Sequence, residues 1–89
     1  MIERQIEISN RLGLHARAAA KLVQLLGTSK SSAWLVYKER EINAKSIMGV
    51  MMLAAGFGSM VTLKVDGPDE AQTADAVVDL FQRRFDEGQ

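Results

Sequence analysis

The spacing of apolar residues switches along the chain between strict alternation and the spacing of a helix, and this switch constrains the fold most. Residues 2–8 alternate, with isoleucines on one face and Arg4 interrupting them, which predicts a half-buried strand. From Ala16 the spacing becomes helical, and Gly27 stands where that helix would end. The inward face predicted for the helix is Ala16, Ala19, Ala20, Val23 and Leu26.

The middle of the chain predicts two strands, a short helix and one more strand. Residues 33–37 are rich in large β-forming side chains, and residues 40–44 are expected to return beside them as a hairpin. Ser46 precedes the apolar residues 47–53, and a serine in that position favours a helix start. Residues 60–66 alternate strictly and predict the last strand. Its expected inner face is Val61, Leu63 and Val65.

A final helix is expected after Gly67 and Pro68, with Asp69 and Gln72 forming a capping box at its start. The side chains predicted to point inward from it are Ala71, Ala74, Val78, Phe81 and Phe85. The resulting order, β-α-β-β-α-β-α, predicts an α+β fold in which helices cover one face of a single antiparallel sheet. With no repeats or linkers, residues 1–89 are expected to form one domain.

Composition narrows the range of functions. The chain has no cysteine, so disulfides and thiolate metal sites are excluded, and no metal is expected. Its 11 basic and 11 acidic residues balance, which argues against nucleic acid as a partner. The first residues lack the pattern of a signal peptide, and no apolar run approaches the ~20 residues that span a bilayer. A cytoplasmic location without membrane insertion is therefore expected.

His15, the only histidine, stands where the first helix is expected to begin. The first N–H groups of a helix lack intrahelical partners and carry partial positive charge, so this position stabilises an anion such as a phosphoryl group. Arg17 would supply a guanidinium to the same oxygens. A lone histidine is more often a surface or structural residue, but the loop before it, which contains Gly13, favours a functional role.

Two separated motifs, Gly13-Leu14-His15-Ala16-Arg17 and Lys45-Ser46-Ile47-Met48-Gly49-Val50-Met51, resemble the HPr family of histidine-containing phosphocarrier proteins of the bacterial phosphotransferase system. The motif separation, the element order and the length agree with that family as well. The resemblance implies an open-faced β-sandwich with strand order 1-4-2-3 and three helices on one side.

The resemblance also implies how His15 works. Its Nδ1 would accept a phosphoryl group from enzyme I, which is charged by phosphoenolpyruvate, and pass it to an enzyme IIA domain. Arg17 would be the electrostatic partner of the phosphate, and the backbone of Ala16 and Arg17 would bind it. The protein would be a carrier rather than an enzyme, needing no cofactor, and we expect a monomer.

Ser46 has two interpretations. Serine is a preferred N-cap, and most such serines do nothing else. The resemblance implies a regulatory role, because an ATP-dependent HPr kinase phosphorylates this serine in regulated members of the family. A phosphate there would add negative charge to a surface that docks partners. The residues expected to dock partners are Ile47, Met48 and Met51, whereas Val50 and Leu53 are expected in the core.

Ala18 departs from the family pattern, which commonly has proline there. Alanine is a good helix former, so we expect the helix start to survive the change. Residues 7–13 lean mildly toward a nitrogen-related branch of the family that regulates without transporting sugar, so that branch stays an alternative. A small ferredoxin-like module that binds RNA or amino acids is the second alternative, although its RNA version predicts a basic face that the charge balance does not favour.

Overall fold

The computed structural model describes residues 1–87 and contains a four-stranded antiparallel sheet. The strands are β1 (Ile2–Glu7), β2 (Ser32–Tyr37), β3 (Arg40–Asn43) and β4 (Met60–Asp66). Their order in the sheet is β1-β4-β2-β3, so β4, the last strand along the chain, lies between β1 and β2.

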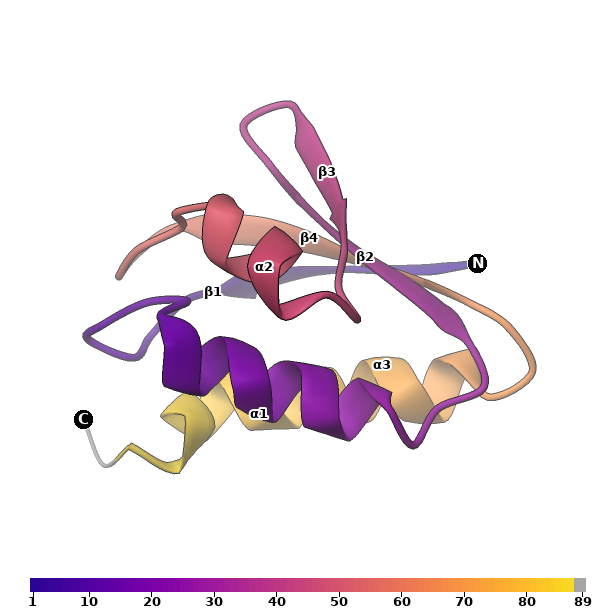
Figure 1. Ribbon diagram of the computed structural model, residues 1–89. Helices are drawn as coiled ribbons and strands as arrows, with labels where there is room; N and C mark the ends of the chain where they lie inside the picture. Colours follow the sequence, from indigo (N-terminus) through magenta and orange to yellow (C-terminus); the bar gives the residue numbers. More distant parts are fainter. Residues whose placement is uncertain (88–89) are drawn as a thin grey trace.

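Three helices, α1 (Ala16–Leu26), α2 (Ile47–Met52) and α3 (Glu70–Gln82), pack on one face of this sheet (Figure 1). A short 3-10 turn, Arg84–Asp86, follows α3. The expected α+β fold, an open-faced β-sandwich with strand order 1-4-2-3 and three helices, is therefore confirmed. None of the helices formed by residues 1–87 has the length and apolar character needed to cross a bilayer.

The strict alternation of β4 places its apolar side chains between the sheet and the helices. Val61, Leu63 and Val65 are buried, as predicted, and Leu63 pairs with Leu35 of β2. The β2–β3 hairpin is also confirmed, with Tyr37 opposite Arg40. The two loop residues between them, Lys38 and Glu39, both have positive φ, the backbone that suits a two-residue hairpin although neither is glycine.

The buried face of α1 differs from the predicted one. Ala16 and Ala20 are exposed and Val23 is only half-buried. The buried residues of α1 are Ala18, Ala19, Leu22 and Leu26. The alanines are alike in hydrophobicity, so their spacing fits two adjacent stripes of the helix equally well. Leu22 removes more apolar area from water than an alanine does, and it determines which stripe faces the core.

The buried face of α3 was predicted in part. Ala74, Phe81 and Phe85 are buried as expected, but Ala71 is exposed and Val78 is only half-buried. The remaining buried residues of α3 are Thr73, Val77 and Leu80. Phe85 does not belong to α3, because the helix ends at Gln82 and Phe85 lies in the following 3-10 turn.

The predicted capping box of α3 is wrong. Asp69 is the N-cap residue, but its side chain makes no capping hydrogen bond. Its carboxylate instead accepts hydrogen bonds from the Ser29 hydroxyl at 3.0 Å, the Lys30 N–H at 3.1 Å and the Ser31 hydroxyl. These donors precede β2, so a tertiary contact uses the carboxylate that the local motif assigned to the helix.

Candidate functional site

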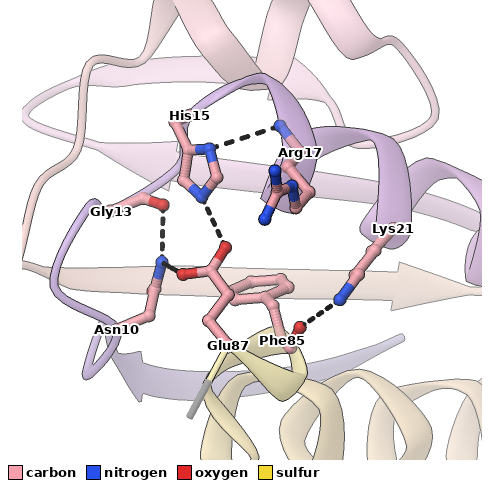
Figure 2. A network of polar contacts seen from close by, with 7 residues as sticks. All are labelled: Asn10, Gly13, His15, Arg17, Lys21, Phe85 and Glu87. Carbon is pink, nitrogen blue, oxygen red and sulfur yellow. Dashed lines mark hydrogen bonds and ion pairs between the residues drawn. The ribbon is translucent and has the colours of Figure 1, made fainter. Parts of the chain in front are cut away.

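His15 is the N-cap residue of α1, as predicted, with an extended backbone. Its Nδ1 accepts a hydrogen bond from the Arg17 N–H at 3.3 Å (Figure 2). The side chain is 26% exposed, so the ring is partly accessible to a second molecule. A distance of 3.3 Å is at the long end for a hydrogen bond, which leaves this N–H available to a better acceptor.

The loop before α1 fixes His15 by its close approach to the segment after α2. Leu14 is buried and its N–H donates to the carbonyl of Ala55 at 3.1 Å. Gly13 has φ of +68°, and a Cβ added there would lie 2.7 Å from Ala55 O and from Gly56 Cα. Glycine is therefore required at this position both for its backbone conformation and for space.

The start of α1 places backbone N–H groups that have no intrahelical partner beside the imidazole. The first intrahelical bond runs from Ala19 N–H to His15 C=O at 2.8 Å, so the amides of Ala16, Arg17 and Ala18 have no carbonyl in the helix to donate to. The Arg17 side chain is exposed and forms no ion pair within residues 1–87. These groups together suit a phosphoryl dianion.

Two residues that the sequence analysis missed complete the surroundings of His15. The Nε2 of His15 lies 2.5 Å from Oε2 of Glu87, and the side-chain amide of Asn10 donates to the other carboxylate oxygen at 3.2 Å (Figure 2). Asn10 also donates to Gly13 O at 2.8 Å. Asn10 stands in a loop and could have been suspected on that ground. Glu87 is one of many acidic residues, and nothing in its spacing marks it.

Ser46 is the N-cap of α2, and its hydroxyl accepts a hydrogen bond from the Gly49 N–H at 3.0 Å. The predicted position of Ser46 as the N-cap of this helix is thereby confirmed. The residue is half-buried, and it begins a helix that packs against α1. Ser46 and His15 thus stand at the starts of two neighbouring helices.

Large apolar side chains are exposed on α2, on the loop that follows it and on the loop before α1. Val50 and Leu53 are buried as expected. The exposed ones are Leu12, Ile47, Met48, Met51, Met52 and Phe57. Ile47, Met48 and Met51 were singled out from the sequence, and the other three were not. Exposed apolar side chains at four positions of one six-residue helix, α2, are typical of a surface that binds partners.

The family model for the "PTS HPr component phosphorylation site" matches residues 2–83. The chain belongs to the HPr family. Among curated proteins, the phosphocarrier protein HPr of Cupriavidus necator is 55% identical to it over 100% of both chains. Among solved structures, HPr from Thermoanaerobacter tengcongensis superposes with a TM-score of 0.94 at 44% identity, covering 98% of each chain. An HPr dimer from the same organism superposes with a TM-score of 0.76 at 44% identity, covering 96% of this chain and 98% of that one.

Membership of the HPr family identifies this chain as a phosphocarrier of the phosphotransferase system. It decides against the ferredoxin-like alternative. The family match includes the segment that carries His15.

Proposed function

We propose that this HPr-family chain accepts a phosphoryl group on Nδ1 of His15 from enzyme I charged by phosphoenolpyruvate, and passes it to enzyme IIA domains. The observation that carries the proposal is the hydrogen bond from the Arg17 N–H to Nδ1. An acceptor nitrogen presents its lone pair to the donor, so the lone pair of Nδ1 faces the amides at the start of α1. A phosphoryl group on Nδ1 would meet those same amides.

The start of α1 supplies the charge that a phosphoryl group needs. Its oxygens would take hydrogen bonds from the amides of Ala16 and Arg17, and the helix dipole favours negative charge there. Arg17, with no ion pair within residues 1–87, would supply the balancing guanidinium. Because the ring is partly exposed, a donor and an acceptor protein can each reach it in turn.

The chain is proposed as a carrier and not as an enzyme. The active sites of its partners would complete each transfer, so the chain itself would need neither a cofactor nor a metal. We further infer that residues 1–89 act as one domain, as a monomer in the cytoplasm. The HPr dimer solved from Thermoanaerobacter tengcongensis makes the oligomeric state a quantity to measure, by light scattering at working concentration.

Ser46 is proposed as a regulatory site for an ATP-dependent HPr kinase/phosphorylase. A phosphate at the N-cap of α2 would lie at a helix start, where negative charge is tolerated. It would also stand beside the docking residues Ile47, Met48 and Met51, where it would weaken binding to an acidic surface of enzyme I. Incubation with such a kinase and ATP should phosphorylate the parent and leave Ser46→Ala unmodified.

Phosphotransfer in a purified system tests the main proposal. Enzyme I and phosphoenolpyruvate should add one acid-labile phosphoryl group to the parent protein, with a ³¹P signal typical of Nδ1-phosphohistidine. His15→Ala should take up none. Failure of every cognate enzyme I to phosphorylate the folded parent, or equal uptake by His15→Ala, would reject the assignment.

The downstream acceptor distinguishes the sugar branch from the nitrogen-related one. The sequence of residues 7–13 keeps the second branch open as a candidate. Offering the charged protein to each enzyme IIA encoded in its source organism, and comparing transfer rates, would identify the acceptor. Preferred transfer to a sugar-specific domain supports the first branch.

A further inference from the structure

Glu87 binds the His15 ring with a carboxylate that is almost completely enclosed. Its side chain is 7% exposed, and each oxygen has a different partner. Oε2 lies 2.5 Å from Nε2 of His15, and Oε1 accepts from the Asn10 amide at 3.2 Å. Exposed ion pairs contribute little to the stability of a fold, since water competes for both partners. A carboxylate that is removed from water and hydrogen-bonded at both oxygens restricts the orientation of its partner much more.

The two ring nitrogens of His15 have different partners, and those partners determine where the hydrogen lies. Nδ1 faces the Arg17 N–H, so it must carry the lone pair. Nε2 faces a carboxylate oxygen, which only accepts, so Nε2 must carry the hydrogen and donate it. Figure 2 shows the ring held between these two contacts. The nitrogen proposed to accept the phosphoryl group is thus the one left unprotonated.

We propose that Glu87 is a positioning residue for phosphoryl transfer at His15. It holds the ring in the Nε2–H form with Nδ1 toward the start of α1, and it stabilises the positive charge that the ring gains during transfer. This inference rests on the proposed function of His15 and deepens it. A carboxylate that orients a histidine and stabilises its imidazolium is familiar from hydrolytic triads.

The chemical step balances without loss of a proton. Nδ1 gives its lone pair to phosphorus, and the bond between phosphorus and the donor breaks, with its electron pair leaving on the donor. Nε2 keeps its hydrogen, so the ring becomes cationic as the Nδ1–P bond forms. Glu87 already lies at Nε2, and it stabilises that cation without rearrangement. Transfer onward to the next acceptor runs the same step in reverse.

An unusual backbone turn brings Glu87 to the ring. Arg84, Phe85 and Asp86 have φ of +57°, +55° and +59°, three consecutive residues in the left-handed region. Each costs about 1–2 kcal/mol for a residue other than glycine. Phe85 offsets part of this cost because it is buried, with its ring centroid 4.8 Å from that of Phe81. The Lys21 ammonium also donates to the Phe85 carbonyl at 2.5 Å, which ties the turn to α1.

Asn10 joins Glu87 to the loop that carries His15. Its side chain is fully buried and donates both to Gly13 O and to Glu87 Oε1. Its own Oδ1 is buried without a partner within residues 1–87, which carries a cost. The two acceptors therefore orient the side-chain amide through its NH₂ group, and this orientation leaves Oδ1 without a hydrogen bond. The strained turn and the unpaired oxygen are both costs, and both occur in the segments that place the Glu87 carboxylate against the His15 imidazole.

Two variants of Glu87 and one control test this role. Glu87→Ala removes the acceptor, and Glu87→Gln keeps an acceptor oxygen but removes the charge. Asp86→Asn is the matched control, since Asp86 is the adjacent carboxylate and pairs with Arg83 rather than with His15. Two quantities are measured on each folded protein: the NMR signal of the His15 Nε2–H, and the single-turnover rate of phosphorylation by charged enzyme I.

The parent and Asp86→Asn should show a downfield, slowly exchanging Nε2–H proton, and Glu87→Ala should lose it. Phosphorylation of Glu87→Ala should slow on the order of 10- to 100-fold, and Glu87→Gln should be slowed as well, because the charge is missing. An Nε2–H signal that survives in Glu87→Ala, or parental rates in both Glu87 variants, would overturn the inference. If enzyme I phosphorylates no form at all, the proposed function fails, while the Nε2–H signal still reports on Glu87.

Discussion

At the scale of single residues, Gly13 determines whether His15 can lie at the start of α1. Its backbone is left-handed, and the space where a Cβ would go is filled by backbone atoms of residues 55 and 56. We expect Gly13→Ala to lower the free energy of unfolding by more than ~2 kcal/mol, because both the conformation and the contact become unfavourable. Urea unfolding measures this change. Gly58 also has positive φ but has open space around it, so Gly58→Ala should lower the free energy of unfolding by less.

Ala18 offers a second test at residue scale, because the family commonly has proline at this position. The amide of Ala18 precedes the first intrahelical hydrogen bond, so proline would remove a donor that the helix does not use. Ala18→Pro should fold with its free energy of unfolding changed by less than ~1 kcal/mol and should still be phosphorylated. Thermal unfolding and phosphotransfer check both points. A loss of helix α1 in the variant would show that the buried methyl group of Ala18 is needed.

The half of the site that contains His15 could be predicted, whereas the half that contains Glu87 could not. His15 is the only histidine and stands at a recognisable helix start, so local rules suffice. Glu87 reaches the ring through three left-handed residues, none of them glycine, and propensities do not anticipate such a turn. Its partner Asn10 lies 77 positions away in the sequence. Tertiary contacts bring the two segments together: the burial of Phe85, the hydrogen bond from Lys21 to the Phe85 carbonyl and the hydrogen bond from Asn10 to Glu87.

At the scale of elements, α2 depends on the hydroxyl of Ser46. The helix has 6 residues, too few to be stable without tertiary contacts and a cap. Ser46→Ala should lower the free energy of unfolding by about 1 kcal/mol, and so the melting temperature by about 4–8 °C. Ser46→Asp should melt close to the parent because aspartate also caps, yet it should accept phosphoryl groups from enzyme I more slowly. Calorimetry and phosphotransfer rates separate the two effects.

A melting temperature for Ser46→Ala equal to that of the parent would mean that the 3.0 Å bond to Gly49 contributes nothing. If Ser46→Asp and the parent were phosphorylated at equal rates, charge at this position would not affect docking. Met52→Ala on the same helix is a useful comparison, since Met52 is exposed and was not predicted to dock.

The limits of local pattern are visible in the helices. Strand faces were predicted well, because the side chains of a strand alternate between only two faces and the alternation in β4 is uninterrupted. In α1 the run of alanines fits two adjacent faces of the helix equally well. The burial of Leu22 determines which of the two faces the core. In α3 the capping box failed because Ser29, Lys30 and Ser31 reach the carboxylate of Asp69 from outside the helix. Tertiary hydrogen bonds took precedence over a local motif in that case.

At the scale of the whole molecule, Asp69 links the segment before β2 to the start of α3. Hydrogen bonds hold the pKa of the Asp69 carboxyl well below its usual range. The Ser31 hydroxyl has the largest effect, and the Lys30 N–H and the Ser29 hydroxyl have smaller ones. The folded pKa is depressed, so the stabilisation is present above the unfolded pKa of about 3.9 and is lost as pH falls below it. The parent should therefore lose stability more steeply than Asp69→Asn between about pH 5 and pH 2.

Urea unfolding at a series of pH values measures this difference. The parent should be the more stable protein at pH 7, and the gap to Asp69→Asn should shrink steadily in acid. Asp75→Asn is the control, because Asp75 is an exposed aspartate of the same helix. A gap between the parent and Asp69→Asn that stays constant with pH would contradict the assignment of the ionised carboxylate as the acceptor.

The position of β4 in the middle of the sheet has a consequence for how the protein is made. Ile2 pairs with Val65, and Ser32 pairs with Asp66, so neither β1 nor the β2–β3 hairpin has its sheet partner until β4 exists. A ribosome must synthesise about three quarters of the chain before the sheet can close. Until then the buried faces of the early strands are open to other nascent chains, and this is the interval in which a chaperone would be of most use.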